Sequence, residues 1–397
     1  MSGIRRVSQL GTTGESTYVD GSIQAVDIAA NAVTQAKLST DIPLSGMRNF
    51  VTNGNMRIAQ RTTSQASITS GTYWTVDRYR TNYSGAAGTW TQTQSTDGPA
   101  GFGNSLKMEC TPTAKTPLDA NSELAIVQRF EGQNLQSIAK GTVSAKPLMV
   151  SFWVKSNKTG TYICELYDYD NSRNCSRSYS ITAAGTWQYV TIAFPSDTTG
   201  AFTNDENLSL HICWFLATGS NFTTGTLQTE WGTAVTANRA VGQTNLADTV
   251  GNYWQVTGVQ LEEGTQPTPF EQRPIGTELA LCQRYCTRLP AQGNTAAYGI
   301  FGAGIGRTAS TTIVDFQIPL PTTMRATPTG ADVFNVRAGD TGAGYTFSTF
   351  TLQTTESSPN CVSMSGGGGS GITGYRPYFI QSNNNATGGY ANFYAEL

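Results

Sequence analysis

The sequence is poor in charge, in long apolar runs and in any excess of one sign. Charged residues make up 13% of its 397 residues, and 25 basic against 27 acidic residues leave a formal net charge of −2. Typical soluble domains carry about 25% charged residues. Because no field of one sign draws polyanions to the chain, we expect neither nucleic acid nor an acidic membrane surface as a partner. No stretch approaches the roughly 18 apolar residues of a membrane span, so we also expect no membrane insertion.

Histidine is nearly absent, and this limits the chemistry that the chain can perform. A histidine-based zinc site needs several such residues, and a Ser-His-Asp triad would depend on His211 alone. His211 lies in LSLHICWFL, where Leu210, Ile212 and Trp214 fall on the opposite face of a strand. We therefore interpret His211 as a strand residue that faces a groove or a partner.

The seven cysteines do not form an even disulfide framework. Most are scattered, and several lie in apolar strand contexts. We interpret these as buried thiols of a reducing compartment. The N-terminal stretch MSGIRRVSQLGTTGES has no apolar run of signal-peptide length, so we expect synthesis in the cytoplasm.

Glycine, threonine, serine and asparagine take the place of the missing charges, a composition typical of β proteins with many turns. Residues 49–274 contain at least eight segments with strand signals, such as LMVSFWVKS at 148–156 and YWQVTGVQLEEG at 253–264. Clusters of Gly, Asn and Asp separate these segments, and no long amphipathic helix interrupts them. We predict an all-β fold in which residues 49–274 form one β-sandwich, a jelly roll.

Residues 1–48 differ from the rest of the chain in the spacing of their large apolar residues. Ile23, Ile28, Val33 and Leu38 recur every five residues. Neither a helix nor a strand keeps such residues on one face. The segment cannot bury its apolar side alone, so we expect it to pack against copies of itself or against another protein. A flexible tail is the alternative interpretation.

The best helix signal covers residues 275–289, IGTELALCQRYCTRL. Leu279, Cys282, Cys286 and Leu289 fall at spacings of three, four and three, the short a/d stripe of a coiled-coil seam. About four turns are too few for a stable isolated helix. We predict a linker helix at the axis of an oligomer, in a short bundle of identical helices. Zinc binding or redox chemistry by the two cysteines is the alternative, but the stripe already explains their spacing.

Residues 290–397 predict a second β domain, which we expect to be a β-sandwich. Its glycine-rich stretch SGGGGSGITG precedes no helix, so we do not expect it to cradle a phosphate. Aromatic residues are dense here. We expect about half of them in the core and the rest on a surface where sugar rings stack on aromatic faces. The candidates for glycan binding are Tyr345, Tyr375, Tyr378, Tyr390, Phe393 and Tyr394.

Two adjacent carboxylates, Glu262 and Glu263, lie where the last strand of residues 49–274 ends. Neighbouring residues of a strand point to opposite faces, so these two cannot form an acid/base pair while the strand persists. Gly264 and three prolines follow and lead the chain toward the helix. We therefore expect a domain boundary here and no active site.

At this point several motifs resemble one family. VDGSIQAVDIAANAVTQAKLS resembles the N-terminal segments of bacteriophage tail-fibre and appendage proteins. NFVTNGNMRIAQRTTS and YWTVDRYR resemble the opening of a jelly-roll domain common in phage structural proteins, and VSFWVKSNKTGTY and WQVTGVQLEEGTQPTPFEQRP resemble its middle and end. ELALCQRYC and PLPTTMRATPT are similar to the bridge and start of the C-terminal domain that often follows. Together the motifs cover most of the chain in the expected order.

The resemblance implies a homotrimeric fibre of the virion tail, made in the host cytoplasm. Residues 1–48 would dock on the tail or connector, the jelly roll would form the body, and residues 290–397 would be the tip that binds a bacterial surface polysaccharide. The jelly roll also resembles carbohydrate-binding modules, many of which hold a structural calcium near the chain ends of the sandwich. Glu262 is then the one candidate ligand for calcium. No other cofactor is implied.

Other functions compete with host recognition. A purely structural adaptor would connect the tail to a separate receptor-binding protein. A glycan-degrading tailspike would need two carboxylates about 5–9.5 Å apart. Acidic residues are sparse and the long regular coils of a parallel β-helix are missing, so we expect no enzymatic activity. A secreted carbohydrate-binding protein unrelated to viruses is disfavoured by the lack of a signal peptide.

Overall fold

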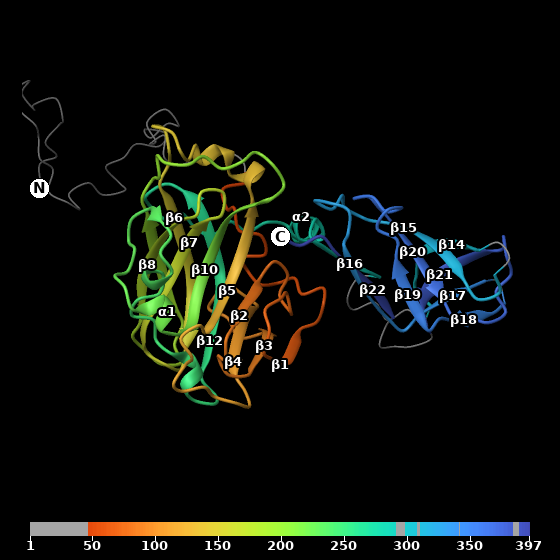
Figure 1. Ribbon diagram of the computed structural model, residues 1–397, viewed down its shortest axis with the longest axis horizontal. Helices are drawn as coiled ribbons and strands as arrows, with labels where there is room; N and C mark the ends of the chain where they lie inside the picture. Colours follow the sequence, from red (N-terminus) through yellow and green to blue (C-terminus); the bar gives the residue numbers. More distant parts are fainter. Residues whose placement is uncertain (1–46, 291–297, 308–309, 341, 384–388) are drawn as a thin grey trace, which may run out of the picture. The chain divides into compact units, whose positions relative to one another are not determined.

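The computed structural model describes residues 47–290, 298–307, 310–340, 342–383 and 389–397 (Figure 1). The chain divides into two units, Met1–Leu44 and Ser45–Leu397. The docking residues predicted in the first unit, Ile23, Ile28, Val33 and Leu38, lie outside the described residues. No helix within the described ranges is long and apolar enough to cross a membrane.

Two six-stranded antiparallel sheets form a β-sandwich, which confirms the all-β prediction (Figure 1). The first sheet has the order β1 (Ser64–Ile68), β3 (Trp90–Ser95), β4 (Ser105–Cys110), β12 (Tyr253–Glu263), β6 (Leu148–Ser156) and β9 (Gln188–Phe194). The second has the order β11 (Gly232–Thr233), β8 (Arg173–Ile181), β7 (Gly160–Asp168), β10 (Leu208–Thr218), β5 (Glu123–Glu131) and β2 (Arg80–Ser84). The consecutive strands β4 to β7 alternate between the two sheets, as in a jelly roll.

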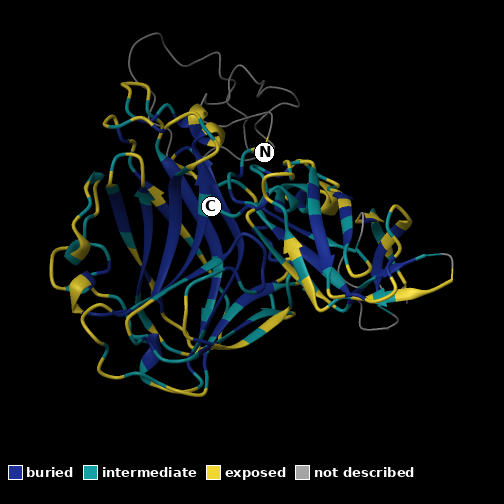
Figure 2. Cartoon of the chain, turned by 45° about the vertical axis from the view of Figure 1, so that its right-hand side comes forward, coloured by how far each residue is buried: buried dark blue, intermediate teal, exposed yellow. Residues whose placement is uncertain are grey.

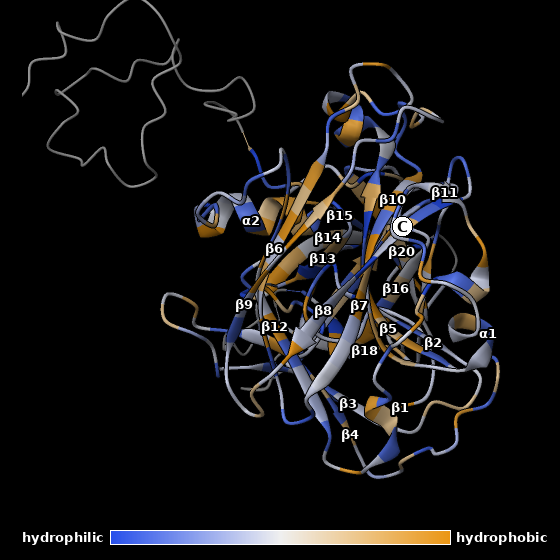
Figure 3. Cartoon of the chain, turned by 90° about the vertical axis from the view of Figure 1, so that its left-hand side faces the viewer, coloured by the Kyte–Doolittle hydropathy of each residue, from blue (hydrophilic) through white to orange (hydrophobic). Residues whose placement is uncertain are grey.

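The core of the sandwich is built from alternate residues of the strands. In β10, Leu210, Ile212 and Trp214 belong to the central cluster and are fully buried. In β6, Val150 and Phe152 belong to the same cluster and are also fully buried. Figure 2 shows that buried residues run along the strands and exposed residues lie in the connections, and Figure 3 shows hydrophobic segments along β6 and β10. The period of two in the sequence therefore predicted which side of each strand faces inward.

The outer face of the second sheet is partly covered by the chain's own segment 219–243. This segment contains α1 (Ser220–Thr223), β11 and the 3-10 turn η5 (Thr236–Asn238), while η4 (Gly132–Ile138) and η6 (Leu246–Asp248) lie elsewhere in the sandwich. Its apolar residues join those of β5, β7 and β10 in a second buried cluster of Ala125, Val127, Ile163, Cys213, Phe215, Phe222 and Ala240. The part of the sheet under this cluster is therefore closed to a ligand.

A buried lysine, Lys140, is enclosed by oxygen atoms at one end of the sandwich. Its Nζ lies 2.6 Å from Asp168 Oδ2 and 3.0 Å from Asp197 Oδ2. The carbonyl oxygens of Thr199 and Gly200 accept further hydrogen bonds from it, at 3.0 and 2.7 Å. Only 3% of the lysine side chain is exposed. We call this arrangement the ammonium cage, because four oxygens surround one buried positive charge.

The segment 275–289 is a helix only in its first part. The helix α2 spans Ile275–Gln283, and Cys286–Leu289 forms the strand β13, which pairs with β22 (Tyr390–Tyr394). The predicted helix up to residue 289 is therefore wrong. Its second half is a strand because a partner strand far along the chain supplies backbone hydrogen bonds, which local periodicity cannot reveal.

The predicted seam of identical helices is also wrong. Cys282 and Cys286 are 0% and 1% exposed within a single chain, and Leu289 packs against the core of the C-terminal sheets. Side chains that are already buried in their own chain cannot pack against another copy, and Leu279 alone makes no stripe. Burial raises the pKa of both thiols.

The C-terminal part of the chain forms two further antiparallel sheets. A three-stranded sheet has the order β13, β22 and β16 (Gly330–Phe334). A seven-stranded sheet has the order β18 (Gly344–Thr346), β17 (Val336–Gly339), β21 (Pro377–Ser382), β14 (Ile300–Gly306), β15 (Val314–Pro319), β20 (Cys361–Gly367) and β19 (Thr349–Leu352). Their shared core includes Phe316, Ile318, Tyr378 and Phe393. Because β13 joins this unit, its sheets begin at Cys286 and not at residue 290.

The last residues of the chain return to the sandwich. The Glu396 carboxylate pairs with Arg61 at 2.7 Å and with Arg78 at 2.8 Å. Arg129 of β5 donates a hydrogen bond to the Leu397 backbone oxygen at 2.5 Å. The Arg78 side chain is only 2% exposed, so its charge depends on this pairing. The return of the chain end fixes one wall of the candidate site.

Candidate functional site

A cleft of about 670 Å³ lies between the three-stranded sheet and residues 61–80 of the sandwich. Its aromatic walls are Tyr73, Trp74, Tyr390 and Tyr394, and its polar groups are Arg61, Arg80, Asp332, Asn392 and Glu396. We call this the aromatic cleft. Aromatic faces combined with amide, carboxylate and guanidinium groups are the side chains that bind sugar rings and their hydroxyls.

The strand β22 positions one wall of the aromatic cleft. Tyr390, Asn392 and Tyr394 alternate along it and therefore share one face of the three-stranded sheet. Asp332 of β16 lies directly opposite Asn392, and the Tyr394 hydroxyl donates a hydrogen bond to the Asp332 carboxylate. Arg288 of β13 lies opposite Asn392 on the other side, with its guanidinium 3.7 Å from the centre of the Tyr390 ring. These contacts fix the orientation of both tyrosine rings.

The opposite wall comes from the segment that leads into β2. The Arg61 guanidinium lies between two rings, 5.5 Å from the centre of Tyr73 and 4.8 Å from that of Tyr394. Its ion pair with Glu396 holds it there. Burial and the neighbouring Asp332 carboxylate raise the pKa of Tyr394. The Tyr394 hydroxyl therefore remains a hydrogen-bond donor at neutral pH.

One amide oxygen in the wall of this cleft has no hydrogen-bond partner. Asn392 is 2% exposed, and its Oδ1 has no hydrogen-bond partner among the described residues. The same holds for the indole Nε1 of Trp74. A buried polar atom without a partner costs about 1–3 kcal/mol, so such atoms usually meet a water or a ligand.

Only two of the six predicted glycan contacts lie in the aromatic cleft, namely Tyr390 and Tyr394. Phe393 and Tyr378 are wrong as contacts, because they belong to the hydrophobic core of the C-terminal sheets and do not line the cleft. Tyr345 packs edge-on against Tyr378 and donates to Asp340. The structure does not bring these residues together into one platform.

Tyr375 is 71% exposed and has a φ of 62° in a turn outside the cleft. The sequence analysis missed the contribution of Arg61, Trp74 and Asn392. The alternation of Tyr390, Asn392 and Tyr394 could have revealed their common face. Nothing in the local sequence relates this face to residues 61–80, because the two segments meet only through the tertiary fold.

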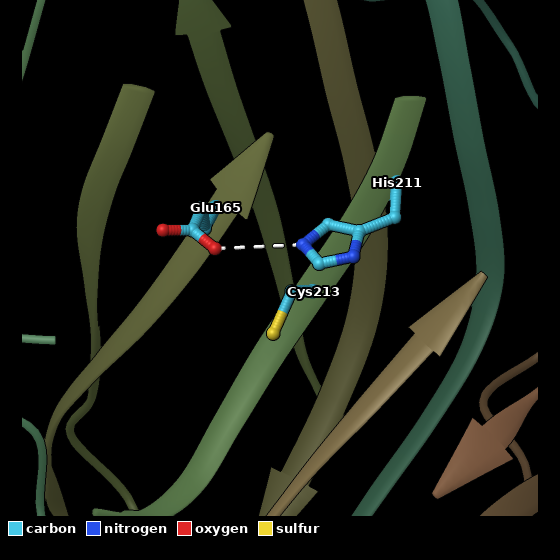
Figure 4. A group of neighbouring side chains, drawn as sticks. All are labelled: Glu165, His211 and Cys213. Carbon is cyan, nitrogen blue, oxygen red and sulfur yellow. Dashed lines mark hydrogen bonds and ion pairs between the residues drawn. The ribbon is translucent and has the colours of Figure 1, made fainter. Parts of the chain in front are cut away.

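Glu165, His211 and Cys213 form a buried group on β7 and β10 that resembles a metal centre by composition (Figure 4). Glu165 is already held by both nitrogens of the Arg239 fork, at 2.9 and 2.5 Å. His211 Nε2 lies 3.5 Å from Glu165 Oε1, and His211 Nδ1 lies 3.1 Å from the Tyr169 hydroxyl. Because the guanidinium supplies the positive charge, this group fits a buried ion-pair network and does not fit a metal.

His211 is therefore buried and does not face an open groove as expected. It is 1% exposed and lies against the rings of Tyr167 and Tyr169. Burial lowers the pKa of His211 below its ordinary value of 6.5, although Glu165 acts in the opposite direction. Burial alone would raise the pKa of Glu165, but Arg239 outweighs it and the pKa is lowered.

This pKa shift predicts a specific loss of stability in mild acid. The unfolded chain takes up a proton at its single histidine below about pH 6.5, whereas the folded chain resists it. The contribution of His211 to the free energy of unfolding is therefore fully present above pH 6.5. It is lost as the pH falls below this value, by up to about 1.4 kcal/mol per pH unit. Urea unfolding of the wild type between pH 7 and pH 5 should show this slope, and His211→Gln should flatten it. Equal slopes for the two proteins would contradict the assignment.

The carboxylate pair at the end of the sandwich carries no acid/base site. Glu262 is fully buried and accepts hydrogen bonds from Gln260 and from the backbone N–H and hydroxyl of Thr268, at 2.6–2.9 Å. Glu263 points away and pairs with Lys146. The donors around Glu262 turn hydrogen atoms toward its oxygens, where a calcium ion would need further oxygen ligands. The arrangement fits a structural link between β12 and the proline-rich exit.

Comparisons with known proteins give similarities of fold only. The chain matches no known family model and no curated protein. Solved structures with similar folds include the enzymatically active domain of tailspike protein 4 from bacteriophage CBA120, which is 14% identical over 54% of this chain and 21% of that chain, with a TM-score of 0.29. This chain thus spans about a fifth of that domain.

Carbohydrate-binding modules are among the other similar structures. TmCBM61 in complex with β-1,4-galactotriose is 10% identical over 55% of this chain and 99% of that chain, with a TM-score of 0.26. The family 11 module of Clostridium thermocellum, in complex with a β-1,3-1,4-mixed-linked tetrasaccharide, is 13% identical over 51% of this chain and 98% of that chain, with a TM-score of 0.26. At such TM-scores these likenesses carry no argument about function.

Proposed function

We propose that this protein is a structural attachment protein of a bacteriophage virion tail, and that it binds bacterial surface glycan in the aromatic cleft. Residues 1–48 dock on the tail or connector. The chain works as a homotrimer, and simultaneous binding by its three clefts raises the overall affinity for a glycan surface. The observation that carries the proposal is the cleft itself, in which the rings of Trp74 and Tyr390 and the polar side chain of Asn392 line one hollow.

The state of the two carboxylates in the cleft supports binding without hydrolysis. Glu396 is held by two arginines, Arg61 and Arg78. Asp332 accepts a hydrogen bond from Tyr394. A glycosidase needs one carboxyl group that remains protonated to act as general acid. Both oxygens of Glu396 are already paired with guanidinium groups, so this side chain is not free to reach a glycosidic oxygen.

Glycan binding is tested by screening the full-length protein on an array of bacterial polysaccharides and measuring the best hit by calorimetry. Tyr390→Ala should weaken binding about tenfold, because one stacking ring contributes about 1–1.5 kcal/mol. Asn392→Ala should weaken it by a similar factor, because the cleft loses one of its polar side chains. Tyr375→Ala is the matched control, because Tyr375 is exposed but lies outside the cleft.

The possible outcomes separate the candidate functions. Equal losses for Tyr375→Ala and Tyr390→Ala would contradict the cleft as the binding site. A protein that binds no glycan but attaches a second fibre protein would be an adaptor. New reducing ends released from the bound polysaccharide would show a depolymerase and overturn the non-enzymatic proposal.

A further inference from the structure

The outward face of the seven-stranded sheet exposes a continuous set of apolar side chains. Ile300, Ile305 and Phe379 on the adjacent strands β14 and β21 are 56%, 49% and 46% exposed. Together with residues of β15 and β20 they line a shallow hollow of about 1140 Å³. We call this surface the apolar face. Exposed apolar side chains that gather on one surface and are rimmed by polar residues often mark an interaction site.

In the strand β14, glycines face the core and larger side chains face outward. Gly302 and Gly304 occupy its inward positions, where a Cβ atom would come within 2.8 Å of Ile380 and 2.4 Å of the Asp315 carbonyl oxygen. The strand therefore contributes little to the core beneath it, and Ile305 lies on the other side. A strand with glycine inside and isoleucine outside has the pattern of a surface that is buried against something else.

Opposite charges flank the apolar face. On the side of β15 and β20, the Arg307 guanidinium donates two hydrogen bonds to the Asp315 carboxylate, at 2.8 and 2.6 Å, so their charges cancel. Glu356 also lines the hollow, and its carboxylate gives this flank a net charge of −1. On the other side, Arg337 of β17 lies 4.2 Å over the ring of Tyr298 and pairs with no carboxylate in the described part of the chain. The strands β21 and β14 lie between the two flanks.

We propose that the apolar face is the contact between copies of this chain, with the Arg337 flank of one copy against the partner's Glu356. A second copy is the occupant that these observations favour, because one surface carries both the apolar centre and the two complementary charges. The inference rests on the oligomer of the proposed function. It names the surface through which the copies contact each other, because the predicted helix stripe is buried within its own chain.

Assembly is measured by light scattering of the full-length protein at micromolar concentration. Three chains of 42.4 kDa give an expected mass of about 127 kDa. Ile305→Asp should yield monomers, because it places an unpaired charge in each contact. Val143→Asp is the control, since Val143 is 99% exposed in the sandwich and should leave the assembly intact. A monomeric wild type, or an Ile305→Asp protein that assembles like the wild type, would overturn the proposal.

Charge reversal tests the register of the contact without touching its apolar centre. Glu356→Arg and Arg337→Glu should each weaken assembly about tenfold, more at low salt than at high salt. The double variant should restore assembly, because the two charges are exchanged and remain complementary. If the two losses of assembly simply add in the double variant, the proposed pairing of Arg337 with the partner's Glu356 is contradicted.

Measurements of glycan binding distinguish a failure of this inference from a failure of the proposed function. The Ile305→Asp monomer should retain the affinity of a single aromatic cleft for a soluble oligosaccharide, and should lose only its slow release from a glycan-coated surface. A wild-type dimer of about twice 42.4 kDa would support the apolar face and contradict the trimer. Assembly without any glycan binding would contradict the proposed function and leave the apolar face supported.

Discussion

Replacing Lys140 by methionine should lower the free energy of unfolding by about 3–5 kcal/mol, the usual result of removing one partner from a buried ion pair. The ammonium cage holds Asp168 and Asp197, whose side chains are 0% and 4% exposed. Without the ammonium, Asp168 loses its counter-ion, and Asp197 keeps only its pair with Arg173. Methionine fills a similar volume, so the loss reports the charge and not a cavity.

Thermal and urea unfolding measure this effect, and the midpoint temperature should fall by roughly 2–4 °C per kcal/mol in a domain of this size. Lys146→Met is the matched control. Lys146 also pairs with a glutamate, but its side chain is 48% exposed, and its loss should cost less than about 1 kcal/mol. Equal effects of the two variants would contradict the cage. Because the cage carries its own cation, EDTA should leave the midpoint of the wild type unchanged.

The second large effect is expected at the end of the chain. Glu396→Gln should lower the free energy of unfolding by about 3–5 kcal/mol, because it leaves the buried Arg78 without a counter-ion and Arg61 with only Asp77, 4.0 Å away. The side chains of Arg61 and Arg78 are only 11% and 2% exposed. The same change should weaken glycan binding, since Glu396 holds Arg61 between the rings that line the aromatic cleft.

Urea unfolding and hydrogen exchange of β22 measure the effect of Glu396→Gln. Exchange in β22 should accelerate, because the residues after this strand are no longer held. Glu206→Gln is the control, since the exposed Glu206 carries no ion pair among the described residues, and surface changes of this kind stay within about 0.5 kcal/mol. Unaltered exchange in β22 would show that the strand does not depend on the returning chain end.

Much of the sandwich could be predicted from the sequence, because strand alternation is a local signal. Val150, Phe152 and Val154 alternate in the sequence, and all three are fully buried in the central core. The single histidine was placed on the correct strand and on the face opposite Leu210. Its burial was not foreseen, because the rings of Tyr167 and Tyr169 that cover it come from a neighbouring strand.

Features that depend on distant segments could not be predicted. Cys286 looked helical by spacing but is a strand residue, because β22 pairs with it. The aromatic cleft joins Trp74 to Tyr390, and the ammonium cage joins Lys140 to Asp168 and Asp197. Such groups form only when the whole chain folds, and periodicity carries no information about them.

The returning chain end also has a mechanical consequence. The C-terminal sheets are joined to the sandwich covalently through α2, which leads into β13 at Cys286. At the same end of these strands, where Cys286 pairs with Tyr394, the arginines that hold Glu396 and Leu397 form a second connection. A pulling force on these sheets is therefore shared by two neighbouring strands, β13 and β22, and the ion pairs must break before the covalent connection is stretched alone. An anchor of this design yields in two stages under drag.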